Sequence, residues 1–136
     1  MGFFISIQTY SHATTSVWDV LRTELQLNHA VEQPQVQAQI RWLSQHPSYI
    51  RGLAQSEPFI YHIVTEIKKR HLPGELALIP MIESDFDPFS YSNRGAVGLW
   101  QIMPKTGDEL GLKQNWWVDG RRGISSSTNA ALNFFA

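Results

Sequence analysis

Residues 76–111, LALIPMIESDFDPFSYSNRGAVGLWQIMPKTGDELG, decide how this chain is expected to fold. With Glu75 before it, the stretch begins as an apolar run that closes at Glu83, which predicts a buried helix over residues 75–83. Pro80 inside this run removes one backbone hydrogen bond and is expected to kink the helix. The polar residues that follow, at 85–95, predict a loop. One carboxylate therefore stands where an apolar helix meets a polar loop.

The second half of this stretch and the flanking sequence also predict helices. Residues 96–103 and 105–110 predict two short pieces separated by Pro104, with Gly111 as a C-cap. Apolar residues at helical spacing predict four helices on the amino-terminal side. They are expected at 15–27 behind a capping box of Ser16 and Asp19, from Pro34 to before Pro47, from Pro47 to near Ser56, and from Pro58 to before Pro73. A last helix, capped by the small polar residues at 125–129, is expected to reach Ala136, so the fold class is all-α.

Composition limits the functions that this chain can have. Its 136 residues, 43% of them hydrophobic, suffice for one compact core. The formal net charge of -1 comes without a basic stripe, so we expect no nucleic-acid partner. The sequence has no cysteine, which excludes a disulfide framework, a thiolate nucleophile and a cysteine zinc site. No cofactor is expected.

The amino end and the apolar runs give no sign of membrane insertion. MGFFISIQTYSHA, residues 1–13, lacks the basic start and the long apolar core of a secretory signal peptide. No run approaches the ~18 apolar residues that a membrane-spanning helix needs. We therefore expect neither a signal peptide nor a transmembrane segment in this sequence.

Glu83 is the leading candidate for catalysis. Apolar neighbours such as Ile79 and Ile82, together with Trp100 folding back towards it, would disfavour the charged form and raise the pKa of its carboxyl group. A glutamate in such surroundings can act as a general acid near neutral pH. The structural alternative is a local cap or salt bridge, which is a common role for a carboxylate of this kind.

Two nearby aspartates offer a different interpretation. Asp85 and Asp87 could supply the second carboxylate that many glycosidases use as nucleophile or base. Turn formation before Pro88 accounts for both of them more simply. This acidic cluster also lacks the spacing of a calcium loop, the histidines form no HExxH, and the serines form no GxSxG, so we expect neither a metal site nor a serine hydrolase.

Several aromatic residues are concentrated around Glu83. Tyr91, Trp100, Trp116 and Trp117 offer flat faces that suit stacking on sugars, although core packing explains any single aromatic residue more often. Their concentration near one carboxylate favours a carbohydrate site, and we expect Tyr91 and Trp100 to contact the substrate.

The motifs together resemble one known family. They are PGELALIPMIES at 73–84, YSNRGAVGLWQIMPKTG at 91–107, GLKQNWWVDGRRG at 111–123 and STNAALNFF at 127–135. In this combination, residues 74–136 resemble the catalytic domain of lytic transglycosylases of the goose-type lysozyme-like superfamily, glycoside hydrolase family 23. Residues 14–73, with HPSYI and a helix ending in EIKKRH, resemble the segment that precedes it. The resemblance implies three parts: a loose segment at 1–13, a helical segment at 14–73 and the front part of a lysozyme-like catalytic domain at 74–136.

The resemblance also assigns roles to individual residues. It implies that Glu83 is the single catalytic acid and base and that Ser84 supports it. Ser92 matches a serine near the N-acetyl group of the substrate. Gln101 and Met103 match positions that line the glycan groove.

The implied reaction cuts peptidoglycan without water. Glu83 would protonate the glycosidic oxygen between N-acetylmuramic acid and N-acetylglucosamine. It would then take the proton of the muramic acid 6-hydroxyl, which attacks C1 and gives a 1,6-anhydro end. The substrate's own N-acetyl group assists, so a second carboxylate is not needed.

The resemblance also implies what surrounds this chain. In the family, further helices with an AYNxG-type segment follow, so the domain is expected to be incomplete after residue 136. In full-length members a lipoprotein-type signal precedes the domain and LysM repeats follow it, and we recognise neither in this sequence. The family suggests a location in the cell envelope, in the periplasm or at the outer membrane. We expect a monomer. Two other hypotheses stay open at this point: an inactive remnant that only binds glycan or acts as an interaction module, and a lysozyme-type hydrolase.

Overall fold

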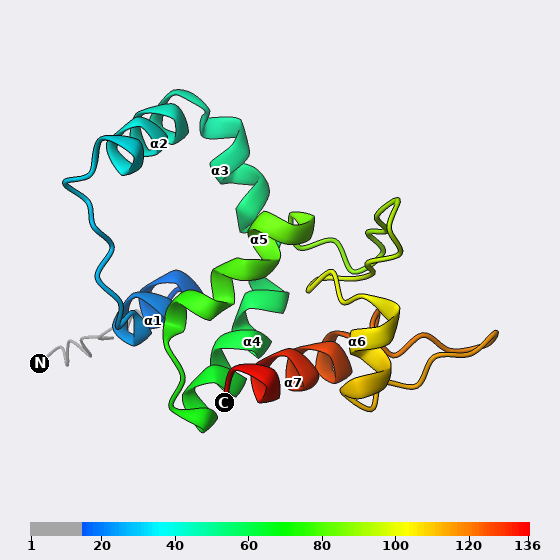
Figure 1. Cartoon of the computed structure of the whole chain (residues 1–136). Helices are drawn as coiled ribbons and strands as arrows, with labels where there is room; N and C mark the ends of the chain where they lie inside the picture. Colours follow the sequence, from blue (N-terminus) through cyan, green and yellow to red (C-terminus); the bar gives the residue numbers. More distant parts are fainter. Residues whose placement is uncertain (1–14) are drawn as a thin grey trace, which may run out of the picture.

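The computed structural model describes residues 15–136, and the expected loose segment at 1–13 lies outside them. The described part is all-α, as expected, with no strand assigned and only isolated bridges. In chain order its elements are α1 (Val17–Glu24), α2 (Pro34–Gln45), α3 (Pro47–Ala54), α4 (Glu57–Arg70), the 3-10 helix η1 (Gly74–Leu78), α5 (Ile79–Ser84), α6 (Pro104–Glu109) and α7 (Ile124–Phe135) (Figure 1). No helix in this part of the chain is long and apolar enough to cross a bilayer.

The core forms around α4, which lies between the amino-terminal helices and α7 (Figure 1). The face expected from its sequence is the buried one, and Ile60, Ile63, Val64 and Ile67 all lie inside. Helices α1 and α7 and the 3-10 helix η1 pack on α4, and they add residues such as Leu21, Ala77 and Leu132 to the same core. By contrast, no residue of α2 or α3 is buried.

The apolar run at 75–83 does not form one kinked, buried helix. It divides into η1 and α5, and Pro80 lies in the first turn of α5, where a missing N–H breaks no helical hydrogen bond. Of this run only Ala77 and Pro80 are buried, whereas Ile82 and Glu83 are exposed. The expectation of a buried helix was wrong because the carboxyl end of α5 lies at the surface.

Residues 96–103 were also expected to be helical, and this was wrong. Val97 instead makes isolated bridges with Tyr91 and Ile102, so the segment folds back on itself. Its path needs a positive φ of 79° at Gly98, and Pro104 then begins α6 rather than separating two helices. The helical conformation is disfavoured for a residue that precedes a proline, here Met103. This explains why no helix continues from the preceding segment into Pro104.

Helix ends differ from expectation in two other places. The small polar residues at 125–129 lie inside α7, and the helix begins after Gly123 instead. Helix α1 is shorter than expected, and the capping box is not formed. Ser16 does cap the helix, because its Oγ accepts a hydrogen bond from the Trp18 amide at 3.3 Å, whereas Asp19 pairs with Arg22.

An ionic cluster joins α4 to α7. The Glu66 carboxylate accepts hydrogen bonds from Lys69 and Arg70, each at 2.6 Å. Arg70 also donates to the side chains of Asn129 at 2.9 Å and Asn133 at 3.3 Å on α7. Because these donors favour the charged form, Lys69 first and then Arg70 lower the pKa of Glu66 to about 2.

This cluster should make the stability of the fold depend on pH. The pKa of Glu66 is lower in the folded chain than its ordinary value of 4.5, so its stabilising effect is complete above about pH 4.5 and is lost as the pH falls towards 2. We expect the free energy of unfolding to fall across this window by less in Glu66→Gln than in wild type, measured by urea denaturation at several pH values. Glu109→Gln, which removes an exposed pair with Lys105, is the control and should keep the wild-type slope. Equal slopes in wild type and Glu66→Gln would contradict this assignment.

Two glycines of the folded-back segment test how tightly it packs. Gly95 and Gly98 both have positive φ, at 87° and 79°, so an alanine strains either backbone by roughly 1–2 kcal/mol. A Cβ at Gly98 would also collide with the carbonyl oxygen of Arg121, whereas one at Gly95 meets Pro104 only at 3.6 Å. We therefore expect Gly98→Ala to lose about 1–3 kcal/mol more than Gly95→Ala in chemical denaturation. Equal losses would mean that the backbone at Arg121 moves to accommodate the added methyl group without lowering the free energy of unfolding.

Candidate active site

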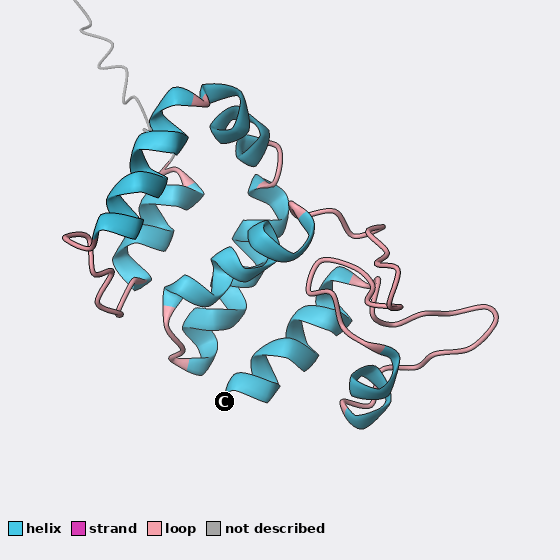
Figure 2. Cartoon of the chain, turned by 45° about the horizontal axis from the view of Figure 1, so that its top comes forward, coloured by secondary structure: helices cyan, strands magenta, loops and turns pink. Residues whose placement is uncertain are grey.

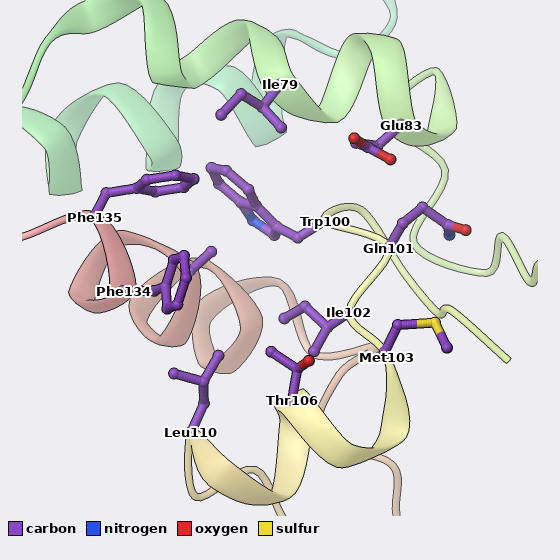
Figure 3. A pocket seen from close by; sticks show the side chains of 11 residues that line it. Ile79, Glu83, Trp100, Gln101, Ile102, Met103, Thr106, Leu110, Phe134 and Phe135 are labelled. Carbon is purple, nitrogen blue, oxygen red and sulfur yellow. The ribbon is translucent and has the colours of Figure 1, made fainter.

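A cavity of about 250 Å³ opens between α5, α6, α7 and the segment before α6. Figure 3 shows its side chains, with Glu83, Gln101 and Met103 towards one side and Phe134 and Phe135 towards the other. Most of the lining is apolar, and it consists of Ile79, Glu83, Trp100, Gln101, Ile102, Met103, Thr106, Leu110, Ala131, Phe134 and Phe135. Sequence reasoning missed the contribution of α7, although the apolar residues near the end of that helix were an available signal.

Glu83 is the single ionisable residue of this lining. It lies in the last turn of α5, which ends where Asp85 adopts a left-handed conformation with φ of 51°. Its side chain is exposed, so the apolar enclosure expected from the sequence is not seen among the described residues. A carboxylate at the open rim of an apolar cavity is accessible to a ligand that enters it (Figure 3).

Ser84 fixes the end of α5. Its Oγ lies 3.1 Å from the carbonyl oxygen of Pro80, in the preceding turn, and 2.9 Å from that of Leu99. The contact with Leu99 joins α5 to the folded-back segment at the residue next to Trp100. The two walls of the cavity are thereby held together one residue away from Glu83.

Trp100 forms a buried wall of the cavity. Its side chain is only 7% exposed, and its indole Nε1 donates to Thr128 Oγ1 on α7 at 3.1 Å. The expectation that Trp100 folds towards Glu83 agrees with the structure, since both line this cavity. A direct contact between Trp100 and a sugar stays a prediction.

Gln101 and Met103 also line this cavity, and their expected contact with a glycan strand stays a prediction. Gln101 has a φ of 47°, a strained value for this residue type, and its Nε2 donates to the Gly98 carbonyl oxygen at 2.9 Å. The Met103 side chain is partly exposed at the cavity edge, just before α6. Both side chains lie on the same side as Glu83 (Figure 3).

Ser92 and Tyr91 are not among the residues that line the cavity. Ser92 Oγ accepts a hydrogen bond from the Ala96 amide at 2.9 Å and so shapes the turn before the folded-back segment. Tyr91 is exposed and pairs with Val97 through the backbone. Their expected contacts with substrate stay predictions.

Asp85 and Asp87 lie outside the cavity lining and have structural contacts. Asp87 Oδ1 accepts from the Phe89 amide at 2.8 Å, which agrees with the turn expected before Pro88. Asp85 accepts a long hydrogen bond of 3.4 Å from the hydroxyl of Tyr49. No group of three potential metal-binding residues occurs within residues 15–136.

Sequence reasoning missed Arg121, which holds the cavity wall from behind. Arg121 is only 7% exposed, and its guanidinium donates to both oxygens of Asp119, at 2.9 and 2.7 Å. It also donates to the carbonyl oxygens of Gly95 at 2.9 Å and Ile102 at 3.1 Å. The side-chain hydrogen bonding from Arg121 to Asp119 is the largest cause that lowers the pKa of Asp119. The acidic and basic residues two apart in VDGRRG were the available signal, but spacing alone does not show that such a pair is buried.

Comparison with known proteins agrees with this geometry. The family model described as Transglycosylase SLT domain matches residues 61–136, more than half of the chain. Membrane-bound lytic murein transglycosylase D of Escherichia coli (strain K12) is 39% identical over 118 residues, which cover 86% of this chain and 26% of that protein. A protein named Putative tributyltin chloride resistance protein, from Alteromonas sp. (strain M-1), is 51% identical over 81 residues, or 60% of this chain and 39% of that protein.

The chain thus spans about a quarter to two fifths of the length of these curated relatives. The matched region contains α5, the folded-back segment, α6 and α7, and so every residue of the cavity lining. The expected family is therefore confirmed, and the chain belongs to the SLT transglycosylase domain family.

Proposed function

We propose that this chain is a lytic transglycosylase domain that cuts the glycan strands of peptidoglycan, with Glu83 as both acid and base. One observation carries the proposal: Glu83 is the single ionisable side chain on a cavity whose other walls are apolar or uncharged. The relative from Escherichia coli is named as a murein transglycosylase, which supports the same substrate. A second carboxylate, which a typical glycosidase requires, is missing from this lining.

The chemistry needs one carboxyl group that transfers a proton twice. Protonated Glu83 donates its proton to the glycosidic oxygen as the bond from C1 of N-acetylmuramic acid to that oxygen breaks. The resulting carboxylate then accepts the proton of the 6-hydroxyl, whose oxygen bonds to C1 and closes the 1,6-anhydro ring. Glu83 ends protonated again, so no water and no cofactor is consumed. The N-acetyl oxygen of the substrate stabilises the positive charge at C1 between these steps.

The neighbouring residues have supporting roles in this proposal. Ser84 holds the end of α5 against Leu99 and so fixes the position of Glu83. Gln101 and Met103 contact the strand on the side of Glu83, and the buried Trp100 closes the cavity beneath it. Ser92 and Tyr91 act from the loop that leads into the folded-back segment. Because Glu83 is exposed, the bound strand itself excludes water from the reacting atoms.

The same proposal gives the chain a location and an organisation. The relative from Escherichia coli is named as membrane-bound, and peptidoglycan lies in the cell envelope, so we place this domain in the periplasm or at the outer membrane. We further propose that residues 74–136 form the catalytic part, that 14–73 precede it as a helical segment, and that the chain acts as a monomer.

Replacement of one carboxylate tests this proposal. In Glu83→Gln the proton donor is lost at nearly constant size, so the release of anhydromuropeptides from purified sacculi should fall by on the order of a hundredfold or more. Asp87→Asn is the matched control, because its Oδ1 can still accept from the Phe89 amide outside the cavity, and it should keep the wild-type rate. Product yield is measured by mass spectrometry.

Three results would overturn the proposal. An unchanged yield from Glu83→Gln would remove Glu83 from the reaction. Binding of glycan by wild type without any anhydromuropeptide product would favour a module that only binds. A loss in Asp87→Asn equal to that in Glu83→Gln would point to a pair of carboxylates instead.

A further inference from the structure

The most exposed aromatic rings of the described chain lie outside the cavity. Trp116 and Trp117 are 89% and 87% exposed at the tip of residues 113–120, which we call the Trp hairpin. This loop, which lies between α6 and α7 in the chain, extends away from the helices (Figures 1 and 2). Burial of an aromatic side chain is strongly favourable, so two neighbouring rings in water form a surface suited to a ligand.

The tip of the Trp hairpin is an ordered turn. The Asn115 amide donates to the Val118 carbonyl oxygen at 2.8 Å, and Asn115 Oδ1 accepts from the amides of Trp117 and Val118, each at 2.9 Å. At the base, the Gly120 amide donates to the Lys113 carbonyl oxygen at 2.8 Å. The backbone that presents both rings is therefore fixed before any ligand arrives, which lowers the entropic cost of binding.

The hairpin is bonded to the wall of the Glu83 cavity. Gln114 Nε2 donates to the carbonyl oxygen of Pro104, the residue after Met103, at 2.8 Å. Asp119, in the hairpin itself, pairs with Arg121, which in turn donates to the carbonyl oxygen of the cavity residue Ile102. The cavity and the two Trp rings are thus held in a fixed position relative to each other. This favours a single long ligand that contacts both places.

Two cations at the base of the Trp hairpin indicate the kind of ligand. Lys113 lies at the base of the Trp hairpin and Arg122 lies just beyond it, and neither forms a salt bridge within the described residues. Arg122 donates to the carbonyl oxygen of Phe89 at 3.1 Å, and its positive charge also helps to lower the pKa of Asp119. A strand that runs from the Trp rings along the hairpin towards the cavity would pass these two cations, which attract its carboxylates.

The geometry points to the Trp hairpin as a second binding surface for the glycan strand that Glu83 cuts. This inference rests on the proposed function. The occupant is a β-1,4-linked N-acetylhexosamine strand whose sugar rings stack on Trp116 and Trp117 and whose carboxylates lie near Lys113 and Arg122. An acidic bilayer would also match two tryptophans and two cations. The hydrogen bonds that fix the hairpin to the cavity wall instead favour a ligand that contacts the cavity and the rings together. The hairpin therefore extends the site towards longer strands.

Binding to strands of two lengths tests this inference. All proteins carry Glu83→Gln, so that strands stay intact during titration. The probes are chitotetraose and long glycan strands freed from sacculi, and binding is followed by calorimetry. For Trp116→Ala/Trp117→Ala we expect the Kd for long strands to rise on the order of tenfold or more, with the Kd for chitotetraose unchanged. Trp42→Ala, at an exposed tryptophan on α2, is the control and should change neither value.

Each other outcome overturns the inference. An unchanged Kd for long strands would show that the Trp hairpin does not bind the glycan. Equal losses of affinity for both probes would indicate that the double variant disturbs the fold. In that case Asn115→Ala, which loosens the turn but keeps both rings, would show the same losses. Loss of binding to vesicles of anionic phospholipid, with long-strand affinity intact, would assign the rings to a membrane. Because the readout is affinity, failure here is distinct from failure of the catalytic proposal, which is measured by product formation.

Discussion

The buried guanidinium of Arg121 is the interaction on which the wall of the cavity depends. It is paired with Asp119, and it donates to two carbonyl oxygens of a segment that has no helix or sheet of its own. Loss of one partner from a buried pair typically costs about 3–5 kcal/mol, since a charge is then left without compensation. Together with the hydrogen bond from Ser84 to Leu99, this anchor holds Gln101 and Met103 on the same side of the cavity as Glu83, and it also holds the base of the Trp hairpin.

Residues with strained backbone conformations lie near the cavity residues Glu83 and Trp100. Asp85, Phe86 and Gln101 have positive φ although none is glycine, and all three lie close in sequence to Glu83 or Trp100. Such conformations cost on the order of 1–3 kcal/mol each and persist only where packing fixes them. Here the packing comes from the core around α4, together with the hydrogen bonds of Ser84 and Arg121. The arrangement is that of a rigid apolar core that holds an exposed, strained rim.

Periodicity predicted the all-α class and the buried face of α4, because a regular apolar stripe has one simple solution. It did not predict the folded-back segment at 96–103, whose shape depends on Gly98 meeting Arg121 from far along the chain. The motif identified Glu83 as the candidate carboxylate, and the structure brings Trp100, Gln101 and Met103 to the same cavity. Pattern alone could not show that Glu83 is exposed, or that Ser92 and Tyr91 lie away from the lining, because both depend on where α5 ends and on how the loop turns.

The proposal that one carboxyl group completes the reaction without water has a direct test. Sacculi are digested by the wild-type chain in water enriched in ¹⁸O, and the new glycan ends are examined by mass spectrometry. A reaction that closes the 1,6-anhydro ring predicts product ends that carry no ¹⁸O, because the attacking oxygen comes from the sugar. Reducing ends that contain one ¹⁸O for each bond cut would contradict the account and assign Glu83 to a hydrolase.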